Sequence, residues 1–140
     1  AIKVVQKLWK AVGAEVSLMT VEEHDSVLAL TSHLPHMLAY TLVDTLAQRS
    51  QNNSIFRYAA GGFKDFTRIA GSDPTMWHDI ALANRDALLN GLDDFEKHLS
   101  DLRYAILNGD GEHLHEVFLR AKQARDYFGE IYARRKPEVQ

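Results

Sequence analysis

Apolar residues recur at helical spacing along most of the chain, and this pattern predicts an all-α fold. The first apolar helical face is made of Val5, Leu8, Trp9 and Val12. Gly13 follows this face as a stop signal, because glycine accepts the left-handed backbone that ends many helices. Residues 14–19 then alternate weakly between apolar and polar positions, so we expect a short strand there. A single strand lacks a partner in this chain, and we expect its sheet in a preceding part of a longer protein.

A second helix is predicted over residues 21–49. Thr20 and Glu23 have the spacing of a capping box, in which the threonine hydroxyl accepts from the Glu23 N–H and the carboxylate reaches back. Pro35 lies inside this helix, where it removes one backbone donor and clashes with the preceding turn. We therefore expect a kink near residues 31–34. Two short helices are expected to follow, over residues 54–60 and 63–70, with the Gly61-Gly62 pair ending the first of them.

A long helix is predicted from Pro74 to about Asn108. Asp73 is a good N-cap and proline suits the first helical position, whereas no strong stop follows before Gly109. At about 1.5 Å per residue this helix would be roughly 50 Å long. Its apolar residues step by four and three, which makes a heptad seam of Leu88, Leu92, Phe95, Leu99, Leu102 and Ile106. One small domain cannot cover so long a seam, so we expect a homodimer that buries it. Asp110 can cap a last helix.

Composition narrows the class of protein. The chain has 140 residues, of which 46% are hydrophobic, and this suits one globular domain. Its 16 Lys+Arg against 19 Asp+Glu give a net charge of −3, which argues against a nucleic-acid partner. No apolar run approaches the roughly 18 residues of a membrane span. The absence of cysteine excludes disulfides and thiolate metal sites. With no signal peptide either, we expect a cytoplasmic protein with no membrane partner.

One cluster of polar residues surrounds the expected kink. Ser32 and His36 share a helical face, and His33 lies next to it. A kink frees backbone groups and opens space, so polar side chains there can face a ligand. Alternatively, these residues only satisfy the backbone groups that the proline leaves without partners.

A second polar cluster covers residues 61–77. Asp65 and Arg68 are three residues apart, so the carboxylate can hold the guanidinium in place for a substrate carboxylate or phosphate. Trp77 lies in the first turn of the next helix, near N–H groups that also favour anions. A surface ion pair and a core tryptophan are the structural alternative. Together the two clusters favour a wall that binds carboxylates.

Histidine and aspartate pairs raise a metal alternative. His24-Asp25 and His78-Asp79 are dipeptides of the kind used by HD-type metal phosphohydrolases, and His33-x-x-His36 has a zinc-like spacing. Neighbours on a helix point about 100° apart, and no third ligand is placed by spacing. We therefore expect no metal. The nucleotide-binding and hydrolase motifs G-x-G-x-x-G, P-loop and G-x-S-x-G are absent.

The two clusters lie in stretches that resemble the C-terminal helical domain of prephenate/arogenate dehydrogenases. The matching stretches, in the family's order, are LWKAVGA at 8–14, EHD at 23–25, SHLPH at 32–36, GGFKDFTRIA at 61–70, and PTMW at 74–77 with Asn84. The resemblance implies an enzyme that oxidatively decarboxylates prephenate or arogenate. NAD or NADP and the catalytic histidine would belong to an N-terminal domain, so this chain alone should be inactive. The helical domain would supply the dimer interface and one wall of the substrate cleft.

The same resemblance assigns six residues to the substrate site: Ser32, His33, His36, Asp65, Arg68 and Trp77. Arg68 would bind a substrate carboxylate, Asp65 would orient Arg68, and Trp77 would line the pocket. No catalytic, cofactor-binding or metal-binding residue is expected here. The implied domains are the end of a nucleotide-binding domain or a connector (1–19), the helical domain (20–132), and a linker or tail (133–140). Tyrosine inhibition and a fused downstream shikimate-pathway synthase domain are further expectations from the family. A purely structural dimerisation module is the main alternative, ahead of an HD-type phosphohydrolase.

Overall fold

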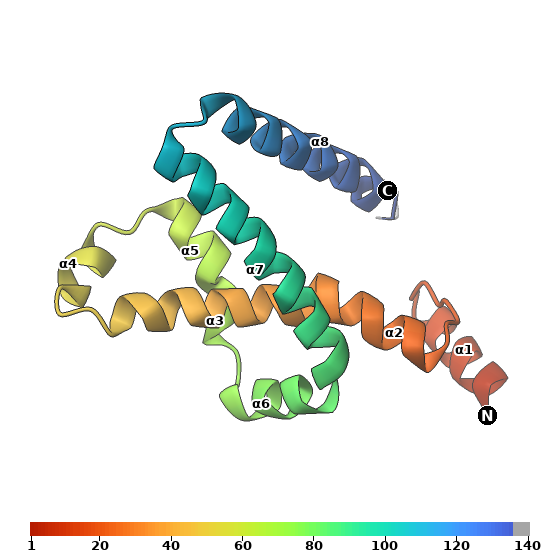
Figure 1. The fold of residues 1–140 in the computed structure, drawn as a ribbon. Helices are drawn as coiled ribbons and strands as arrows, with labels where there is room; N and C mark the ends of the chain where they lie inside the picture. The colour runs from red at the N-terminus through yellow and green to blue at the C-terminus, as the bar shows by residue number, and fades with distance from the viewer. Residues whose placement is uncertain (136–140) are drawn as a thin grey trace. The chain divides into compact units, whose positions relative to one another are not determined.

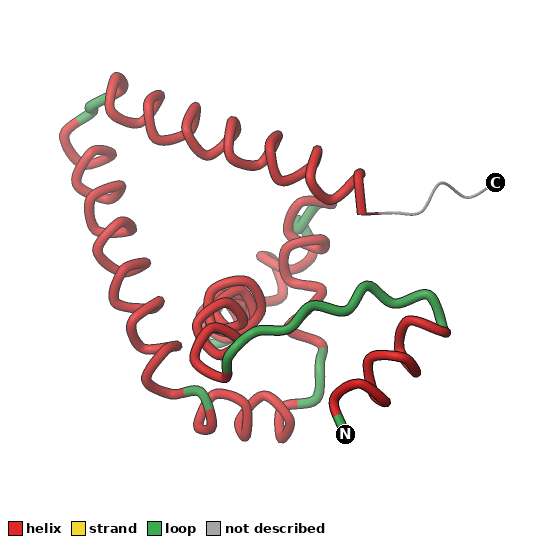
Figure 2. The backbone as a smooth tube through the Cα atoms, turned by 90° about the vertical axis from the view of Figure 1, so that its right-hand side faces the viewer, coloured by secondary structure: helices red, strands yellow, loops and turns green. Residues whose placement is uncertain are grey.

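All the regular structure within residues 1–135 is helical, which confirms the all-α prediction (Figure 2). This computed structural model describes those residues, apart from the side chains of Asn52 and Arg135. The elements are α1 (Ile2–Ala11), α2 (Val21–Leu28), the π-helical η1 (Ala29–His33), α3 (Leu34–Ala47), α4 (Asn52–Arg57), α5 (Gly61–Thr67), the 3-10 segment η2 (Arg68–Gly71), α6 (Pro74–Ala83), α7 (Arg85–Asn108) and α8 (Gly111–Arg135), shown in Figure 1. They fall into two units, Ala1–Leu92 and Asp93–Gln140.

The first helix ends at a glycine with a left-handed backbone conformation. Gly13 has a φ of +85°, and its N–H donates to the Lys10 carbonyl while the Ala14 N–H donates to the Trp9 carbonyl. This pair of bonds is the Schellman motif. The strand expected over residues 14–19 is wrong, because that stretch has no regular structure (Figure 2). A strand needs a neighbour to pair its backbone groups, and the described part of the chain places none beside it.

The helical segment from α2 to α3 has the predicted cap at its start and an irregular turn near the predicted position. The Thr20 N–H donates to Glu23 Oε2 at 2.9 Å and the Glu23 N–H donates to Thr20 Oγ1 at 3.1 Å, which confirms the capping box. The irregularity expected near residues 31–34 is the π-helical η1, whose wider turn precedes Pro35 in the first turn of α3. The helical run nevertheless continues without a break from Val21 to Ala47.

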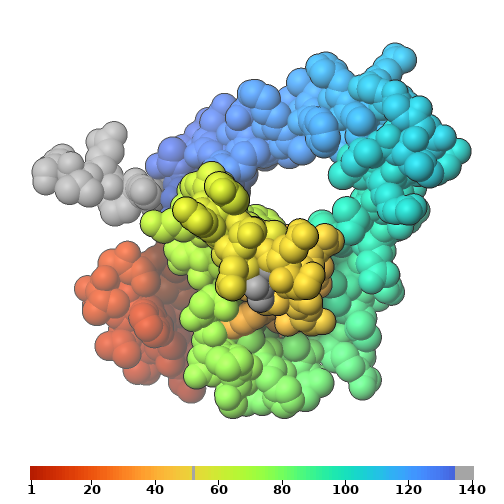
Figure 3. All heavy atoms as spheres, turned by 90° about the vertical axis from the view of Figure 1, so that its left-hand side faces the viewer, coloured from red at the N-terminus to blue at the C-terminus, as the bar shows by residue number. Residues whose placement is uncertain are grey.

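The segments after α3 pack against it. Helices α4 and α5 and the segment η2 all contact α3. The Gly61-Gly62 pair begins α5 and does not end α4, contrary to the sequence prediction, since both glycines keep negative φ after an extended Ala60. The rings of Phe56 and Phe63 lie 6.1 Å apart and join α4 to α5, which lie side by side in yellow and yellow-green in Figure 3.

The single long helix expected over residues 74–108 is wrong. Asp73 caps α6 as predicted, with Oδ1 accepting from the Met76 N–H at 2.9 Å. Asn84 then leaves the helical conformation, with φ −108° and ψ 35°, and α7 begins after it. Within the first unit the buried residues include Ala29, Ala39, Trp77 and Leu88.

The second unit contains the rest of α7 and the last helix. Gly109, with a φ of +65°, ends α7, and Asp110 caps α8 by accepting from the His113 N–H at 3.0 Å. The predicted seam is partly uncovered in the single chain: Leu99 is 52% exposed and Ile106 is 62% exposed, whereas Leu88 is buried. The helix α8 continues to Arg135, and residues 136–140 of the predicted tail lie outside the described residues. None of the described helices is long and apolar enough to cross a membrane.

Candidate functional site

Two histidines from the π-helical turn and α3 meet a buried tryptophan from α6. The His36 imidazole stacks on the Trp77 indole, with centroids 3.6 Å apart and planes at 19°. The His33 ring approaches the same indole edge-on, with centroids 6.1 Å apart and planes at 74°. Trp77 is only 6% exposed. The fold therefore joins one predicted polar cluster to the tryptophan of the other.

His36 is held by its own helix. Its Nδ1 lies 2.8 Å from the Ser32 carbonyl oxygen. A carbonyl only accepts hydrogen bonds, so Nδ1 carries a proton and the neutral ring keeps its lone pair on Nε2. The contact spans four residues, from Ser32 in η1 to His36 in α3. The half-buried Ser32 thus supports the ring through its backbone.

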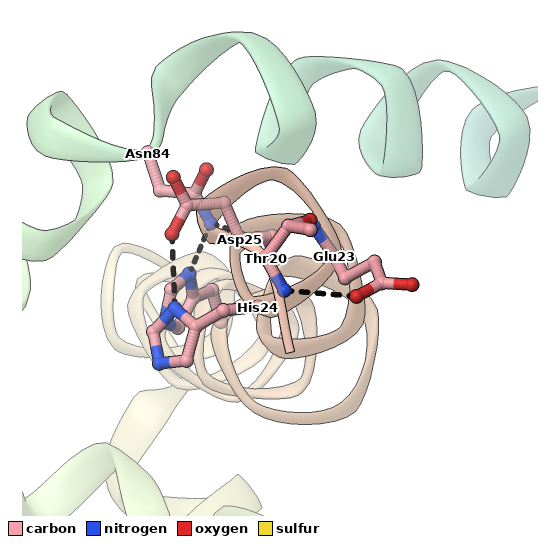
Figure 4. Close-up of polar contacts among 6 residues, drawn as sticks. Thr20, Glu23, His24, Asp25 and Asn84 are labelled. Carbon is pink, nitrogen blue, oxygen red and sulfur yellow. Dashed lines mark hydrogen bonds and ion pairs between the residues drawn. The ribbon is translucent and has the colours of Figure 1, made fainter. Parts of the chain in front are cut away.

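His33 is held from another part of the chain. The Asn84 amide nitrogen lies 3.2 Å from His33 Nδ1 and donates to the Asp25 carbonyl at 2.8 Å (Figure 4). Asn84 lies at the break between α6 and α7, where its side chain reaches back to the α2–η1 segment. The sequence resemblance includes Asn84 but assigns it no role. An asparagine in an otherwise uninterrupted helical pattern was the available signal.

The surroundings of His33 favour its neutral form. Burial is the largest cause of the lowered pKa of His33, followed by the positive charge that His24 and His36 carry when protonated. The Asp25 carboxylate opposes this effect and raises the pKa. The same carboxylate is in contact with His24, whose Nδ1 lies 3.0 Å from Asp25 Oδ1. His33 is therefore suited to act as a neutral hydrogen-bonding group near pH 7.

The predicted pairing of Asp65 with Arg68 is not observed. Both side chains are exposed, and no hydrogen bond or ion pair joins them among the residues that the structure describes. Arg68 begins η2, which packs against α3, the helix that carries His36. The Tyr40 hydroxyl donates to the Ser72 carbonyl at 2.7 Å and holds the end of this segment on α3. An exposed arginine on an anchored segment can still meet an anionic ligand.

An apolar cavity of about 220 Å³ lies beside the tryptophan. It is lined by Met37, Tyr40, Pro74, Trp77, His78 and Ala81. The Trp77 Nε1 atom is buried and has no hydrogen-bond partner within the described part of the chain. A buried indole N–H usually has an acceptor, and none is present for this atom among the described residues.

The histidine–aspartate dipeptides pair internally. His24 with Asp25 and His78 with Asp79 form contacts of 3.0 Å and 2.9 Å. Within residues 1–135, no group of three or more metal-binding side chains is arranged to hold an ion. The Nδ1 atoms of His33 and His36 already face Asn84 and Ser32.

Comparison with known families identifies the chain. Residues 20–120 match the family described as "Prephenate dehydrogenase, dimerization domain". The chain belongs to this family. The resemblance stated from the sequence is therefore confirmed. The π-helical turn, α3 and α6 all lie within the residues matched by the dimerization-domain family.

Two curated relatives and two solved structures support the same family. The chain is 45% identical over 127 residues to cyclohexadienyl dehydrogenase of Zymomonas mobilis, covering 89% of this chain and 43% of that protein. It is 39% identical over 128 residues to prephenate dehydrogenase of Bacillus subtilis, and the match covers 90% of this chain and 34% of that protein. The prephenate dehydrogenase of A. aeolicus, in complex with hydroxyphenyl propionate and NAD+, is similar with a TM-score of 0.83 and 43% identity, covering 91% of this chain and 45% of that one. Synechocystis arogenate dehydrogenase is similar with a TM-score of 0.80 and 28% identity, and the match covers 91% of this chain and 47% of that one. The chain thus spans less than half the length of these relatives.

Within this dimerization domain the six predicted site residues fall into two sets. The structure brings together Ser32, His33, His36 and Trp77. It places Asp65 and Arg68 on α5 and η2 without joining them to each other or to that group. Sequence reasoning gave Asn84 no role and did not single out Tyr40, because the partners of both lie far along the chain.

Proposed function

We propose that this chain is the C-terminal part of an NAD-dependent dehydrogenase that oxidatively decarboxylates prephenate or arogenate. The family match and the names of the relatives support the reaction class. The NAD+ named in the A. aeolicus complex supports the cofactor. When bound, this cofactor accepts a hydride as the substrate ring loses CO2 and becomes aromatic. We assign the cofactor site and the catalytic histidine to a preceding domain, since the relatives are more than twice as long as the matched part.

The contact of two histidines with Trp77 is the observation that carries the proposal for this chain. A ring-containing dicarboxylate needs apolar surface for its ring and donors for its oxygens, and this cluster offers both. We assign Ser32, His33, His36 and Trp77 to one wall of the substrate site. Arg68 contributes a guanidinium that can meet a carboxylate with two parallel N–H bonds. Asp65 orients Arg68 when the ligand is bound.

The chain also forms a homodimer in this proposal. The family is named as a dimerization domain, and the α7 seam exposes Leu99 and Ile106 in the single chain. Apolar seams of this length are usually covered by a partner. We expect the interface to bury more than about 2,000 Å², as obligate dimers do.

The decisive experiment uses the full-length parent enzyme. Reduction of NAD+ is followed by absorbance with prephenate and with arogenate as separate substrates. Activity with either one supports the proposal, and the ratio of kcat/KM identifies the preferred substrate. Absence of activity with both, in protein that binds NAD+, contradicts it.

A structural module and a metal phosphohydrolase make different predictions. A purely structural module dimerises, but variants of Arg68 and His36 leave turnover unchanged. A phosphohydrolase contains stoichiometric metal in elemental analysis of the purified protein. The use of NADP in place of NAD, inhibition by tyrosine, fusion to a shikimate-pathway synthase and a cytoplasmic location stay predictions from the sequence.

A further inference from the structure

The side-chain amide of Asn84 lies against two groups of the α2–η1 segment. It faces the Asp25 carbonyl oxygen at 2.8 Å and His33 Nδ1 at 3.2 Å. Figure 4 shows both contacts as dashed lines from the labelled Asn84. The carbonyl oxygen can only accept, so the amide atom that faces it must be the nitrogen. This argument fixes the orientation of the amide.

The orientation of the amide then determines the protonation of His33. An amide nitrogen has two hydrogens and no acceptor capacity, so it can donate one hydrogen to Asp25 and the other to His33. His33 Nδ1 must accept, and a neutral imidazole that accepts at Nδ1 carries its proton on Nε2. We propose that Asn84 is a positioning residue that holds His33 in the Nε2–H tautomer.

The neighbouring histidine has the opposite arrangement. His36 Nδ1 faces the Ser32 carbonyl at 2.8 Å and therefore carries the proton, which leaves the His36 Nε2 lone pair as an acceptor. The two rings that contact Trp77 thus differ: His33 offers a donor at Nε2 and His36 offers an acceptor. No hydrogen bond to either Nε2 atom is present in the described part of the chain. A ligand oxygen could accept from His33 Nε2, and a ligand hydroxyl could donate to His36 Nε2.

Burial and two neighbouring histidines outweigh the Asp25 carboxylate and favour a neutral His33 ring. His24 and His36 disfavour its protonation, and the Asp25 carboxylate, which favours it, is already in contact with His24 at 3.0 Å. A protonated His33 would set an N–H on Nδ1 against the amide hydrogens of Asn84. The proposal concerns the chain's own side chains, so it holds whichever substrate the enzyme uses.

Nitrogen NMR of the histidine rings tests the proposal directly. The chain is labelled with 15N-histidine and the His33 signals are assigned by their absence in His33→Gln. At pH 8 we expect the His33 proton on Nε2 and the His36 proton on Nδ1. A His33 proton on Nδ1 in the unmodified chain overturns the proposal, and this measurement needs no variant at Asn84.

Substitution at the amide is the second test. In Asn84→Asp the carboxylate can only accept, so the His33 proton should move to Nδ1 and the pKa of His33 should rise by about 1 or more. Asn108→Asp is the matched control, because the Asn108 amide donates to the Tyr104 carbonyl at 2.7 Å and contacts no histidine among the described residues. This control should leave the His33 signals unchanged. An unchanged His33 tautomer in folded Asn84→Asp contradicts a role for Asn84. Neither result depends on dehydrogenase activity, so failure here is distinct from failure of the proposed function.

Discussion

The imidazole of His36 lies flat against the indole of Trp77, with ring centroids 3.6 Å apart. This contact joins the first turn of α3 to α6, which are separated in sequence by α4, α5 and η2. Aromatic pairs of this kind contribute about 0.5–1.5 kcal/mol beyond the area that they bury. The same contact fixes the positions of His36 and Trp77, both of which belong to the proposed substrate site. Trp77 therefore contributes both to stability and to the proposed ligand binding.

Replacing Trp77 should destabilise the chain. Trp77→Ala removes a buried indole and leaves a cavity, which costs about 3–5 kcal/mol in the free energy of unfolding. Trp77→Phe should cost less, since a ring stays against His36. Urea unfolding followed by circular dichroism measures both. Trp9→Ala is the matched control, because Trp9 is 55% exposed and should change stability by under about 1 kcal/mol. Equal losses for the two alanine variants would contradict the assigned core.

Removing Arg68 should weaken substrate binding in the parent enzyme. We expect Arg68→Ala to raise the substrate KM and lower kcat/KM by about 30- to 1,000-fold, or about 2–4 kcal/mol. The KM for NAD+ should stay nearly unchanged. Arg68→Lys should recover only part of the loss, because an ammonium lacks the two-pronged geometry of a guanidinium.

The control for this prediction is Arg57→Ala, which removes an exposed arginine at the end of α4. Its steady-state kinetics should match those of the unmodified enzyme. Unchanged kcat and KM in Arg68→Ala would remove Arg68 from the substrate site. His36→Asn should be milder than Arg68→Ala if His36 only forms hydrogen bonds, whereas a severe loss of kcat would indicate a part in proton transfer.

Stability should fall in mild acid partly because of His33. Burial and the neighbouring histidines lower its pKa in the folded chain below the ordinary 6.5. Between the folded and unfolded pKa values the unfolded chain binds more protons, so stability rises with pH in that window. The contribution is fully present above about pH 6.5 and is lost as the pH falls toward the lowered folded pKa. Urea midpoints between pH 5 and 8 measure it.

Two variants isolate the contribution of His33. His33→Gln should have a smaller pH dependence than the unmodified chain. His115→Gln, at an exposed position on α8, should keep the original dependence. If both variants respond to pH in the same way, the acid sensitivity belongs to other groups.

A charge on the seam should weaken the dimer. Leu99→Asp and Ile106→Asp each place a carboxylate on the apolar face of α7. We expect the dissociation constant to rise at least tenfold, because burying an unpaired charge costs several kcal/mol. Sedimentation velocity at micromolar concentration measures the change, with Ser100→Asp as a polar control on the same helix. A monomer in the unmodified protein, or a seam variant that dimerises normally, contradicts this interface.

Helix ends that depend on residues close together in the sequence were predictable from the sequence. The Thr20–Glu23 capping box, the Asp73 cap and the stop at Gly13 each depend on groups three to five residues apart. Such contacts form whenever the local backbone is helical, so the residue types and spacing are sufficient to predict them. The ordered motifs also identified the family and therefore the residues of the proposed site.

Contacts across the chain were decided only by the tertiary structure. Asn84 interrupts a pattern that reads as one helix, and its partners Asp25 and His33 are 59 and 51 residues away. Helical periodicity contains no information about a partner at that distance, because the hydrogen bond exists only after the chain has folded and Asn84 lies against the α2–η1 segment. A different reason separates Asp65 from Arg68. Their spacing allows an ion pair, but both side chains are exposed, where such a pair gains little over contact with water. Sequence thus determined the capped starts of α2, α6 and α8 and the family to which the chain belongs, and packing determined which polar side chains meet.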